Sequence, residues 1–357
     1  MNKVSKNFWK NKKVFITGHT GFKGSWTSIW LSKLECEVFG FSLEPTSSPS
    51  LFIEADISSD VKTFTGDIRN YDLVYEQIKL FNPEIVIHMA AQPLVRESYK
   101  NPLETYSTNV MGTANVLEAC RHIDSVRAIV NITTDKCYEN KEWEWPYREN
   151  ESLGGHDPYS SSKACSELLS KSYAKSFFND NNVFLATARA GNVIGGGDWS
   201  TDRLIPDALK AFQDKRELVI RNPESTRPWQ HVLEPISGYL CLAEKIYTYG
   251  DEYTGAWNFG PNESGIATVM DVVEKLAKKW GGDASWALDN KSHPHEAKNL
   301  MLDISKARSK LDWRPLWDLD KALDEIITWH KEWLNNSSEI KNTCLKQIQS
   351  YENIMES

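Results

Sequence analysis

Short apolar runs alternate with amphipathic helical patterns through the first half of the chain, and this alternation predicts most of its fold. Six runs rich in apolar and β-branched residues predict strands at 14–17, 37–42, 61–65, 84–88, 126–132 and 183–188. Helical patterns lie between them, at about 24–34, 71–81, 102–121 and 159–178. Strands that alternate with helices form a parallel, doubly wound α/β sheet, whose ligand crevice lies beyond the carboxyl ends of the strands.

The pattern becomes less regular after Arg189, where proline, tryptophan and surface charge become more frequent. We therefore expect a dinucleotide-binding Rossmann domain over residues 1–192, with segments that return to it near 231–261. A smaller α/β substrate domain is expected over 193–230 and 262–357. The end of the chain, from about residue 335, is polar and predicts a solvated helix or tail.

Composition excludes several classes of protein. The formal net charge of -8 argues against an extended nucleic-acid surface, and no apolar stretch is long enough to span a membrane. The basic start of the chain lacks the apolar core of a signal peptide. Six scattered cysteines show no paired spacing, which fits a reducing cytoplasm. His293 and His295 do not predict a metal site, because no third ligand is evident.

Three glycines follow the first predicted strand and open the first helix: Gly18, Gly21 and Gly24. Glycines permit a tight turn and let backbone amides approach a pyrophosphate, and this position in a doubly wound sheet predicts a dinucleotide site. The second strand ends at Ser42 rather than at a carboxylate, and no arginine there could bind a ribose phosphate. We therefore expect loosely held NAD rather than NADP. Asp67 is either a contact to adenine or a loop cap.

Tyr159 and Lys163 are the most informative pair of candidate catalytic residues. Asp157 and Pro158 predict a helix start just before them, and residues four apart share a helix face. A neighbouring cation favours the phenolate form of a tyrosine, which makes it a usable general base for a sugar hydroxyl. On its own, the spacing is also compatible with two unrelated helix residues.

Several motifs together resemble the extended short-chain dehydrogenase/reductases, the family of nucleotide-sugar epimerases and dehydratases. The resemblance covers about residues 12–333 and rests on the runs at 17–24, 88–92, 133–138, 189–199 and 227–232, with Tyr159 and Lys163. The most similar branch is that of the 4,6-dehydratases acting on CDP-glucose, partly because Lys136 stands where dTDP-glucose dehydratases carry a glutamate. His19 replaces a commonly small residue, and we expect its ring to crowd the pyrophosphate.

The resemblance implies that CDP-glucose loses water to give CDP-4-keto-6-deoxyglucose, while NAD is reduced and regenerated. Thr134 would then position the oxygen on sugar carbon 4, Tyr159 would remove its proton, and Lys163 would lower the tyrosine pKa and bond the nicotinamide ribose. Asp135 is the candidate acid for the elimination, and burial must raise its pKa. Lys136 is the candidate base and would have to be neutral; the alternative is a charged anchor or electrostatic stabiliser.

The resemblance also implies which residues bind the ligands. The expected cofactor contacts are Gly18, His19, Gly21, Phe22, Lys23, Gly24, Ser42, Asp67, Ile68, Ala90, Ala91, Gln92, Thr133, Tyr159 and Lys163. Arg227 is the leading candidate for the substrate diphosphate. Further candidates for substrate binding are Gln92, Asn192, Arg203 and, less directly, Arg221, although each arginine could instead form a surface ion pair.

Finally, the resemblance implies a homodimer in which the helices at 102–121 and 159–178 of two subunits form a four-helix bundle, although their apolar faces could instead be core. It also implies a cytoplasmic enzyme that supplies deoxysugars for bacterial surface polysaccharide such as lipopolysaccharide. Two alternatives stay open: a dehydratase or 4-epimerase for another nucleotide sugar, and a catalytically silent NAD-binding protein.

Overall fold

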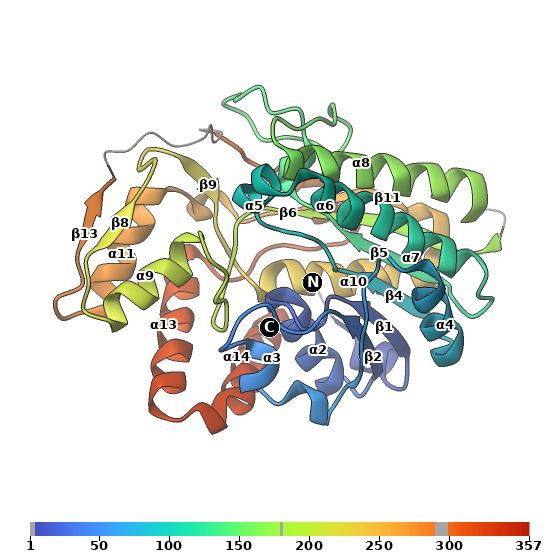
Figure 1. The fold of residues 1–357 in the computed structure, drawn as a ribbon, viewed down its shortest axis with the longest axis horizontal. Helices are drawn as coiled ribbons and strands as arrows, with labels where there is room; N and C mark the ends of the chain where they lie inside the picture. The colour runs from blue at the N-terminus through green and yellow to red at the C-terminus, as the bar shows by residue number, and fades with distance from the viewer. Residues whose placement is uncertain (1–3, 179–180, 290–298, 357) are drawn as a thin grey trace.

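The computed structural model describes residues 4–178, 181–289 and 299–356, and seven parallel strands form its central sheet (Figure 1). The strands run in the order β11-β6-β5-β4-β1-β2-β3. Their bounds are β1 Lys13–Thr17, β2 Glu37–Ser42, β3 Lys62–Thr65, β4 Ile85–His88, β5 Ala128–Ile132, β6 Phe184–Ala190 and β11 Gly255–Phe259. The predicted doubly wound α/β fold is confirmed, and β11 lies in the segment expected to return to the sheet.

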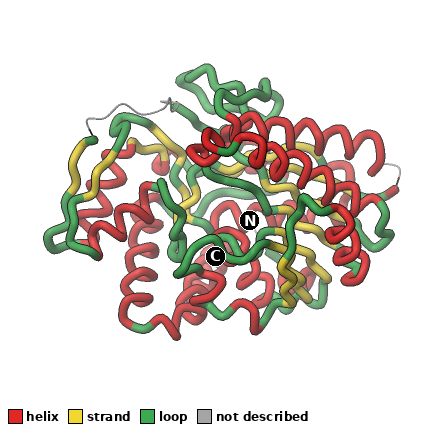
Figure 2. The backbone as a smooth tube through the Cα atoms, in the orientation of Figure 1, coloured by secondary structure: helices red, strands yellow, loops and turns green. Residues whose placement is uncertain are grey.

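Alternation of side chains along the strands divides the core into two layers. Val14 and Ile16 of β1 face one layer, and Phe15 faces the other. The helices that supply the first layer are α2 Phe22–Lys33, α10 Leu233–Tyr249 and α14 Ile340–Glu356, and those of the second are α4 Tyr71–Phe81, α7 Gly112–Arg121 and α8 Pro158–Tyr173. Figure 2 shows helices on both sides of the strands, which explains why the inner strands β4, β5 and β6 are buried along their whole length.

The two long helices predicted at 102–121 and 159–178 each contain a π-helical segment. Segment η2 (Ser107–Met111) joins α6 (Pro102–Tyr106) to α7, and η4 (Ala174–Phe178) follows α8. The shorter elements are α1 Lys6–Trp9, α3 Leu51–Glu54, α5 Val95–Lys100, α12 Ser305–Lys310, η1 Ile57–Ser59, η3 Asp135–Cys137, η6 Gly250–Tyr253, η7 Glu263–Gly265 and η8 Ser337–Glu339. Over the described ranges, no helix has the length and hydropathy of a membrane span.

A second apolar cluster lies beside the sheet, at the left of Figure 1. Its helices are α9 Leu204–Gln213, α11 Val269–Trp280 and α13 Leu319–Asn335. Three small strand pairs accompany them: β8 Leu218–Ile220 with β13 Trp286–Leu288, β9 Thr226–Pro228 with β12 Ile266–Thr268, and β7 Val193–Ile194 with β10 Gln230–His231. The first of these elements, β7, follows β6 in the chain after two residues, so this part of the structure begins at the carboxyl end of β6.

The polar composition of the chain end predicts a solvated helix or tail, and the structure shows that this prediction is wrong. Ile340, Cys344, Ile348 and Tyr351 of α14 are fully buried, and the helix packs against α2 and α13. The hydroxyl of Tyr351 donates to the buried carboxylate of Glu234 on α10. An apolar stripe on one helix face is enough to bury α14, although most of its residues are polar.

If α14 is part of the core, Ile348→Ala will lower the free energy of unfolding by about 2–5 kcal/mol, because it leaves a cavity. Ile354→Ala is the matched control on the same helix, since that side chain is 40% exposed; we expect a change of about 0.5 kcal/mol or less. Denaturant unfolding followed by circular dichroism measures both values. Equal small losses would restore the interpretation of α14 as a solvated helix.

Candidate active site

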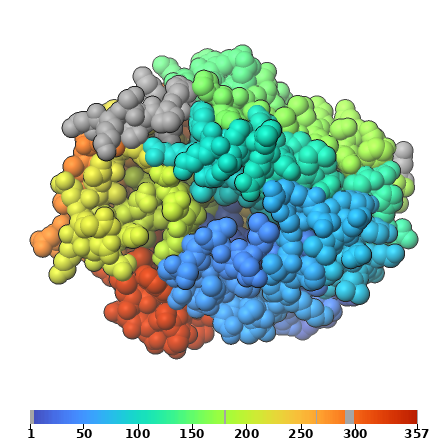
Figure 3. Space-filling model, in the orientation of Figure 1, coloured from blue at the N-terminus to red at the C-terminus, as the bar shows by residue number. Residues whose placement is uncertain are grey.

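The candidate residues gather where the carboxyl ends of neighbouring strands meet. Strands β6, β5, β4 and β1 are adjacent and parallel, so the loops that follow them open at one edge of the sheet. On the surface, a hollow lies where the teal face of α5 and α6, the yellow-green face near residue 200 and the blue face near α3 meet (Figure 3). Segments from distant parts of the chain therefore surround one site.

The turn after β1 is packed so closely that only glycine fits at two positions. Gly18 has a φ of +77°, and a Cβ there would lie 2.7 Å from the amide nitrogen of Ala90. A Cβ on Gly24 would lie 2.1 Å from the carbonyl oxygen of Gly18. Gly21 caps α2 without a side-chain hydrogen bond, so the positive end of the helix meets the turn directly. This arrangement fits the pyrophosphate of a dinucleotide.

Lys23, in the first turn of α2, interacts with the catalytic candidates as well as belonging to the glycine motif. Burial, with the charges of Lys163 and Arg203, lowers the pKa of Lys23 to about 7, and the charge of Asp135 opposes this shift. Its neighbour Phe22 lies over Gly195, where an added Cβ would be 3.0 Å from the ring. The motif thus brings a cation close to the carboxyl end of β5.

The ring of His19 does not crowd the turn as the sequence predicts. It is fully buried, packs edge-on against Phe52 and lies over Gly40, where an added Cβ would be 2.2 Å from the ring. Burial lowers its pKa to about 4. A side chain with no exposed surface cannot contact a ligand that enters from solvent, so the expected crowding of the pyrophosphate is wrong.

The ends of β2 and β3 carry the candidates for the adenosine half of the cofactor. Ser42 shares a 2.8 Å hydrogen bond with the hydroxyl of Thr20. Asp67 accepts the amide and the guanidinium of Arg69, and the Arg69 guanidinium lowers the pKa of Asp67. The carboxylate of Asp67 is therefore already paired, which favours its interpretation as a loop cap. Ile68 is buried beneath α7.

The loop after β4 is held by hydrogen bonds from within the fold. The amides of Met89 and Ala90 both donate to Thr17 Oγ1, each at 3.1 Å. The side-chain amide of Gln92 donates to Leu94 O and Thr105 Oγ1, and its oxygen accepts the amide of Leu94. Gln92 thus shapes the loop in this structure, while Ala90 and Ala91 remain partly exposed towards the site.

Three buried polar residues follow β5: Thr133, Thr134 and Asp135. The Thr134 hydroxyl donates to Asp135 Oδ1 at 3.0 Å, whereas Oδ2 is buried without a hydrogen-bond partner among the described residues. Burial raises the pKa of Asp135, and the charge of Lys136 opposes this shift. A desolvated carboxyl with one unsatisfied oxygen favours its protonated form, in which it can donate a proton.

Helix α8 starts as the sequence predicts. Pro158 is its first residue, and the Asp157 carboxylate accepts the amide of Ser160 at 2.9 Å. Tyr159 and Lys163 follow in the first two turns, and both side chains are buried at the edge of the site. The local capping signal therefore sets the positions of both residues.

Burial shifts the pKa values of Tyr159 and Lys163 in opposite directions. Lys163 Nζ donates to the carbonyl oxygen of Ile132 at 3.1 Å, and burial lowers the pKa of Lys163 to about 8. Burial raises the pKa of Tyr159 to about 12, while the Thr134 hydroxyl and the charge of Arg203 lower it. In this structure, Arg203 is the cation whose charge most strongly lowers the pKa of Tyr159.

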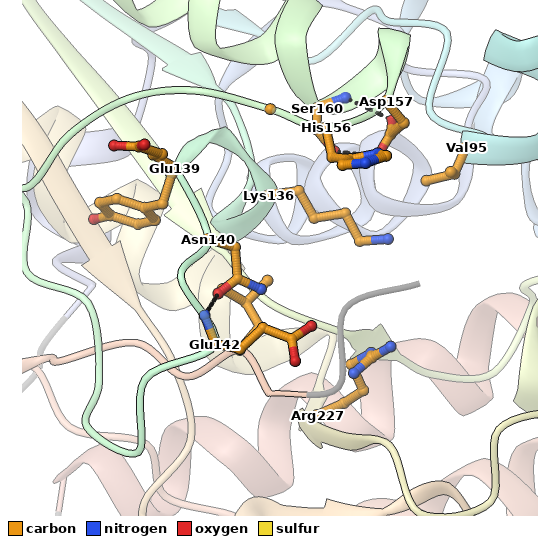
Figure 4. A pocket seen from close by; sticks show the side chains of 12 residues that line it. Val95, Lys136, Glu139, Asn140, Glu142, His156, Asp157, Ser160 and Arg227 are labelled. Carbon is orange, nitrogen blue, oxygen red and sulfur yellow. Dashed lines mark hydrogen bonds between the residues drawn. The ribbon is translucent and has the colours of Figure 1, made fainter. Parts of the chain in front are cut away.

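A pocket of about 300 Å³ lies beside η3 and includes two of the predicted cations, Lys136 and Arg227. The Lys136 side chain extends into the space between Asp157 at the start of α8 and Arg227 of β9 (Figure 4). Lys136 is partly exposed, whereas Arg227 is 7% exposed and its charge acts on Asp135. The two cations therefore lie near the unsatisfied carboxyl group.

The remaining candidates for substrate binding come from the segment after β6. Arg203, at the start of α9, pairs with Asp198 at 3.5 Å, and Arg221 pairs with Asp202 at 3.5 Å. Asp198 is buried and Asp202 is exposed, and substrate binding by either arginine stays a prediction. Asn192 is partly buried where β6 leads into β7. Arg203 is nonetheless close enough to Tyr159 and Lys23 to shift their pKa values.

Sequence reasoning missed the buried ion pair of Glu167 and Arg189 beneath the site. Glu167 follows Lys163 by one helical turn, and this spacing could have indicated that its carboxylate lies on the same helix face as Lys163. His293 and His295 lie outside the described residues. Within residues 4–178, 181–289 and 299–356, no group of three histidine, cysteine or acidic side chains could hold a metal ion.

Comparison with known proteins places this geometry among nucleotide-sugar enzymes. Residues 15–326 match the protein-family model for GDP-mannose 4,6 dehydratase. The chain is 53% identical over 336 residues to CDP-glucose 4,6-dehydratase of Salmonella typhimurium, covering 93% of this chain and 94% of the relative.

Two solved structures share the fold. UDP-glucuronic acid 4-epimerase from Bacillus cereus, solved with UDP-glucuronic acid and NAD, superimposes with a TM-score of 0.77 at 26% identity, over 90% of this chain and 99% of the other. dTDP-glucose 4,6-dehydratase from Bacillus anthracis, solved with NAD, gives a TM-score of 0.74 at 20% identity, over 90% and 97%. Because its sequence identity is only 20%, the second structure supports the fold alone.

Proposed function

This chain belongs to the GDP-mannose 4,6 dehydratase family, and from that premise we propose that it removes water from CDP-glucose to form CDP-4-keto-6-deoxyglucose. The similarity to the Salmonella enzyme supports CDP-glucose as the substrate. The reaction is a lyase reaction without net oxidation, so the cofactor is regenerated in each cycle.

One observation carries the choice of a dehydratase over an epimerase: the buried, unsatisfied carboxyl oxygen of Asp135 close to Tyr159. Epimerisation at carbon 4 requires a base for one hydroxyl and no second acid. Elimination of water from carbons 5 and 6 requires a group that protonates the departing hydroxyl. Asp135, with its raised pKa, is suited to that role.

The residues after β1 fit NAD, because the packed turn of Gly18 and Gly24 exposes the start of α2 to a pyrophosphate. Ser42 and Asp67 would lie towards the adenosine, and Lys163 towards the nicotinamide ribose. When bound, NAD would supply the hydride acceptor for carbon 4 and the hydride donor for carbon 6, and its positive charge would favour the Tyr159 phenolate. The Bacillus cereus epimerase, which was solved with NAD, supports this cofactor.

In the oxidation at carbon 4, we assign Tyr159 the removal of the hydroxyl proton. Thr134 interacts with the phenol and would orient the same oxygen. The pKa of Tyr159, raised to about 12 by burial, means that the phenol must gain cationic neighbours before it acts as a base. Arg203 already supplies one, and the charge of Lys163 would act in the same direction.

In the elimination, Lys136 would take the proton from carbon 5 and Asp135 would give its proton to the oxygen leaving carbon 6. The protons balance, because Lys136 gains the proton of carbon 5 while Asp135 loses one to the hydroxyl that departs as water. The position of Lys136 beside Asp135 supports both transfers. To act as a base, Lys136 must be neutral.

The substrate diphosphate is assigned to Arg227, which lines the pocket together with Lys136. A guanidinium can bind two phosphate oxygens at once, and its burial strengthens that contact. Arg203, Asn192 and Gln92 are further candidates, each placed in a loop around the same site. Binding the diphosphate from the side of β9 would direct the hexose towards Tyr159.

The assignment is tested by incubating the protein and NAD with a panel of nucleotide-linked glucoses and following loss of water by mass spectrometry. We expect loss of water from CDP-glucose, and a fall in kcat of at least about a hundredfold in Tyr159→Phe, because the base is removed. Tyr75→Phe is the matched control and should leave kcat within about twofold. Conservation of mass would identify an epimerase, and no turnover of any sugar would favour a catalytically silent NAD-binding protein.

The role of Lys136 is decided by two substitutions. If Lys136 is the base, Lys136→Gln and Lys136→Arg will both lower kcat by about a hundredfold or more, because neither side chain can accept the proton. An electrostatic anchor would be satisfied by arginine, so recovery of most of kcat in Lys136→Arg contradicts the base. Loss of water measured at saturating CDP-glucose separates the two results.

The same family resemblance leads us to propose a cytoplasmic homodimer. Leu103 on α6, Met111 in η2 and Leu168 on α8 are all more than half exposed, and α6 contacts α8. In Figure 1 these helices lie side by side at one face of the molecule. Exposed apolar side chains on helices that pack together support pairing with a second copy into four helices. All six cysteines are unpaired, as a reducing compartment would allow.

Leu103→Glu with Leu168→Glu should convert the dimer to a monomer, because two charges would be buried in an apolar interface. Analytical ultracentrifugation measures the change. Ile53→Glu on α3 is the matched control, since Ile53 is 55% exposed on a different face; it should leave the molecular mass unchanged. A monomeric wild-type protein, or an unaltered dimer in the double variant, would contradict this interface.

A further inference from the structure

A buried ion pair fastens helix α8 to the sheet directly below the site. Glu167 of α8 accepts two hydrogen bonds from Arg189 of β6, from Nε to Oε1 at 2.9 Å and from Nη2 to Oε2 at 2.8 Å. The side chains of both residues are 3% exposed. This bidentate geometry is the strongest form of such a pair and the most directional.

Two threonines complete the shell of the Glu167 carboxylate. Thr187 Oγ1 donates to Oε2 at 2.7 Å, and Thr133 Oγ1 donates to Oε1. Burial alone would raise the pKa of Glu167, but Arg189 and the two hydroxyls outweigh it and hold the pKa below its usual value. Both oxygens are therefore satisfied and the group stays charged, which makes the arrangement rigid.

Glu167 touches both segments that carry the candidate catalytic residues. Thr133 directly precedes Thr134, Asp135 and Lys136, and it is tied to the carboxylate through its hydroxyl. Lys163 stands one turn before Glu167 on the same helix face. A single carboxylate therefore connects the end of β5 to the first turns of α8.

The charged and titratable groups around Lys163 come from four elements. Burial lowers the pKa of Lys163 to about 8, and Glu167 on α8 is the foremost group that opposes this, followed by Cys137 of η3. Lys23 of α2 interacts with Lys163 as a like charge. His88 of β4 is neutral, because burial lowers its pKa to about 3. Glu167 is thus the carboxylate that favours the ammonium form.

We propose that Glu167 is a positioning residue that keeps Lys163 protonated and holds the segment from Thr133 to Lys136 in register with α8. Only the expected change in kcat rests on the proposed dehydratase function. Without the carboxylate, Lys163 would lose its proton at a lower pH, and the end of β5 would lose one of its contacts to the helix.

The experiment measures the titration of Lys163 in the full-length protein by NMR, with ¹³C at lysine Cε and the signal identified by its absence from Lys163→Gln. Glu167→Gln removes the charge but leaves Arg189 unpaired. The double variant Glu167→Gln with Arg189→Met removes both charges and contains no isolated buried ion. Thr187→Val is the matched control, because it removes one hydrogen bond and leaves every charge in place.

We expect the midpoint for Lys163 to fall by about one pH unit or more in both charge-removing variants and to stay unchanged in Thr187→Val. In the pH profile of kcat, the fall at high pH should move by the same amount. As a result, kcat at about pH 8 should fall roughly fivefold, while KM for CDP-glucose changes little.

An unchanged midpoint in the folded double variant, or an equal shift in Thr187→Val, would overturn the proposal. The NMR titration needs no substrate. It therefore decides the role of Glu167 even if CDP-glucose proves not to be the substrate, and the two proposals fail separately.

Discussion

The parallel register of the sheet is the constraint on which the rest of the structure depends. It aligns Thr17, His88, Asn131 and Thr187 in one row across β1, β4, β5 and β6. Each of these side chains is buried and hydrogen-bonded: His88 to Thr17 and to a threonine of α7, Asn131 to serines of α8, and Thr187 to Glu167. The row fixes the helices against the strand ends, and the candidate chemistry begins immediately beyond it.

Desolvation is the common cause of the unusual acid–base behaviour at this edge. The same burial raises the pKa of Asp135 and of Tyr159, and lowers the pKa of Lys163 and Lys23 towards neutrality. Low polarity favours the neutral form of every group, whatever the sign of its charge. Burial therefore moves the pKa values of Asp135, Lys23 and Lys163 towards neutrality and that of Tyr159 away from it, and Glu167 opposes the shift at Lys163.

The site is complete only when the segment after β6 covers the sheet. Arg203 and Arg227 come from α9 and β9, yet their charges act on Tyr159 and Asp135, which belong to α8 and η3. A doubly wound sheet alone would hold a dinucleotide without these cations. We propose that these two arginines bind the diphosphate of the substrate, in which case substrate binding and acid–base chemistry would share the same residues.

The sequence alone determined the features that depend on neighbours along the chain. The strand and helix periods, the Asp157 cap and the glycine turn after β1 were all predictable, because local sterics and hydrogen bonds decide them. Only the tertiary structure decided the inward ring of His19, the burial of α14, the approach of Arg203 to Tyr159, and the pairing of Glu167 with Arg189. Those outcomes depend on which distant segments exclude water from one another, and no local pattern contains that information.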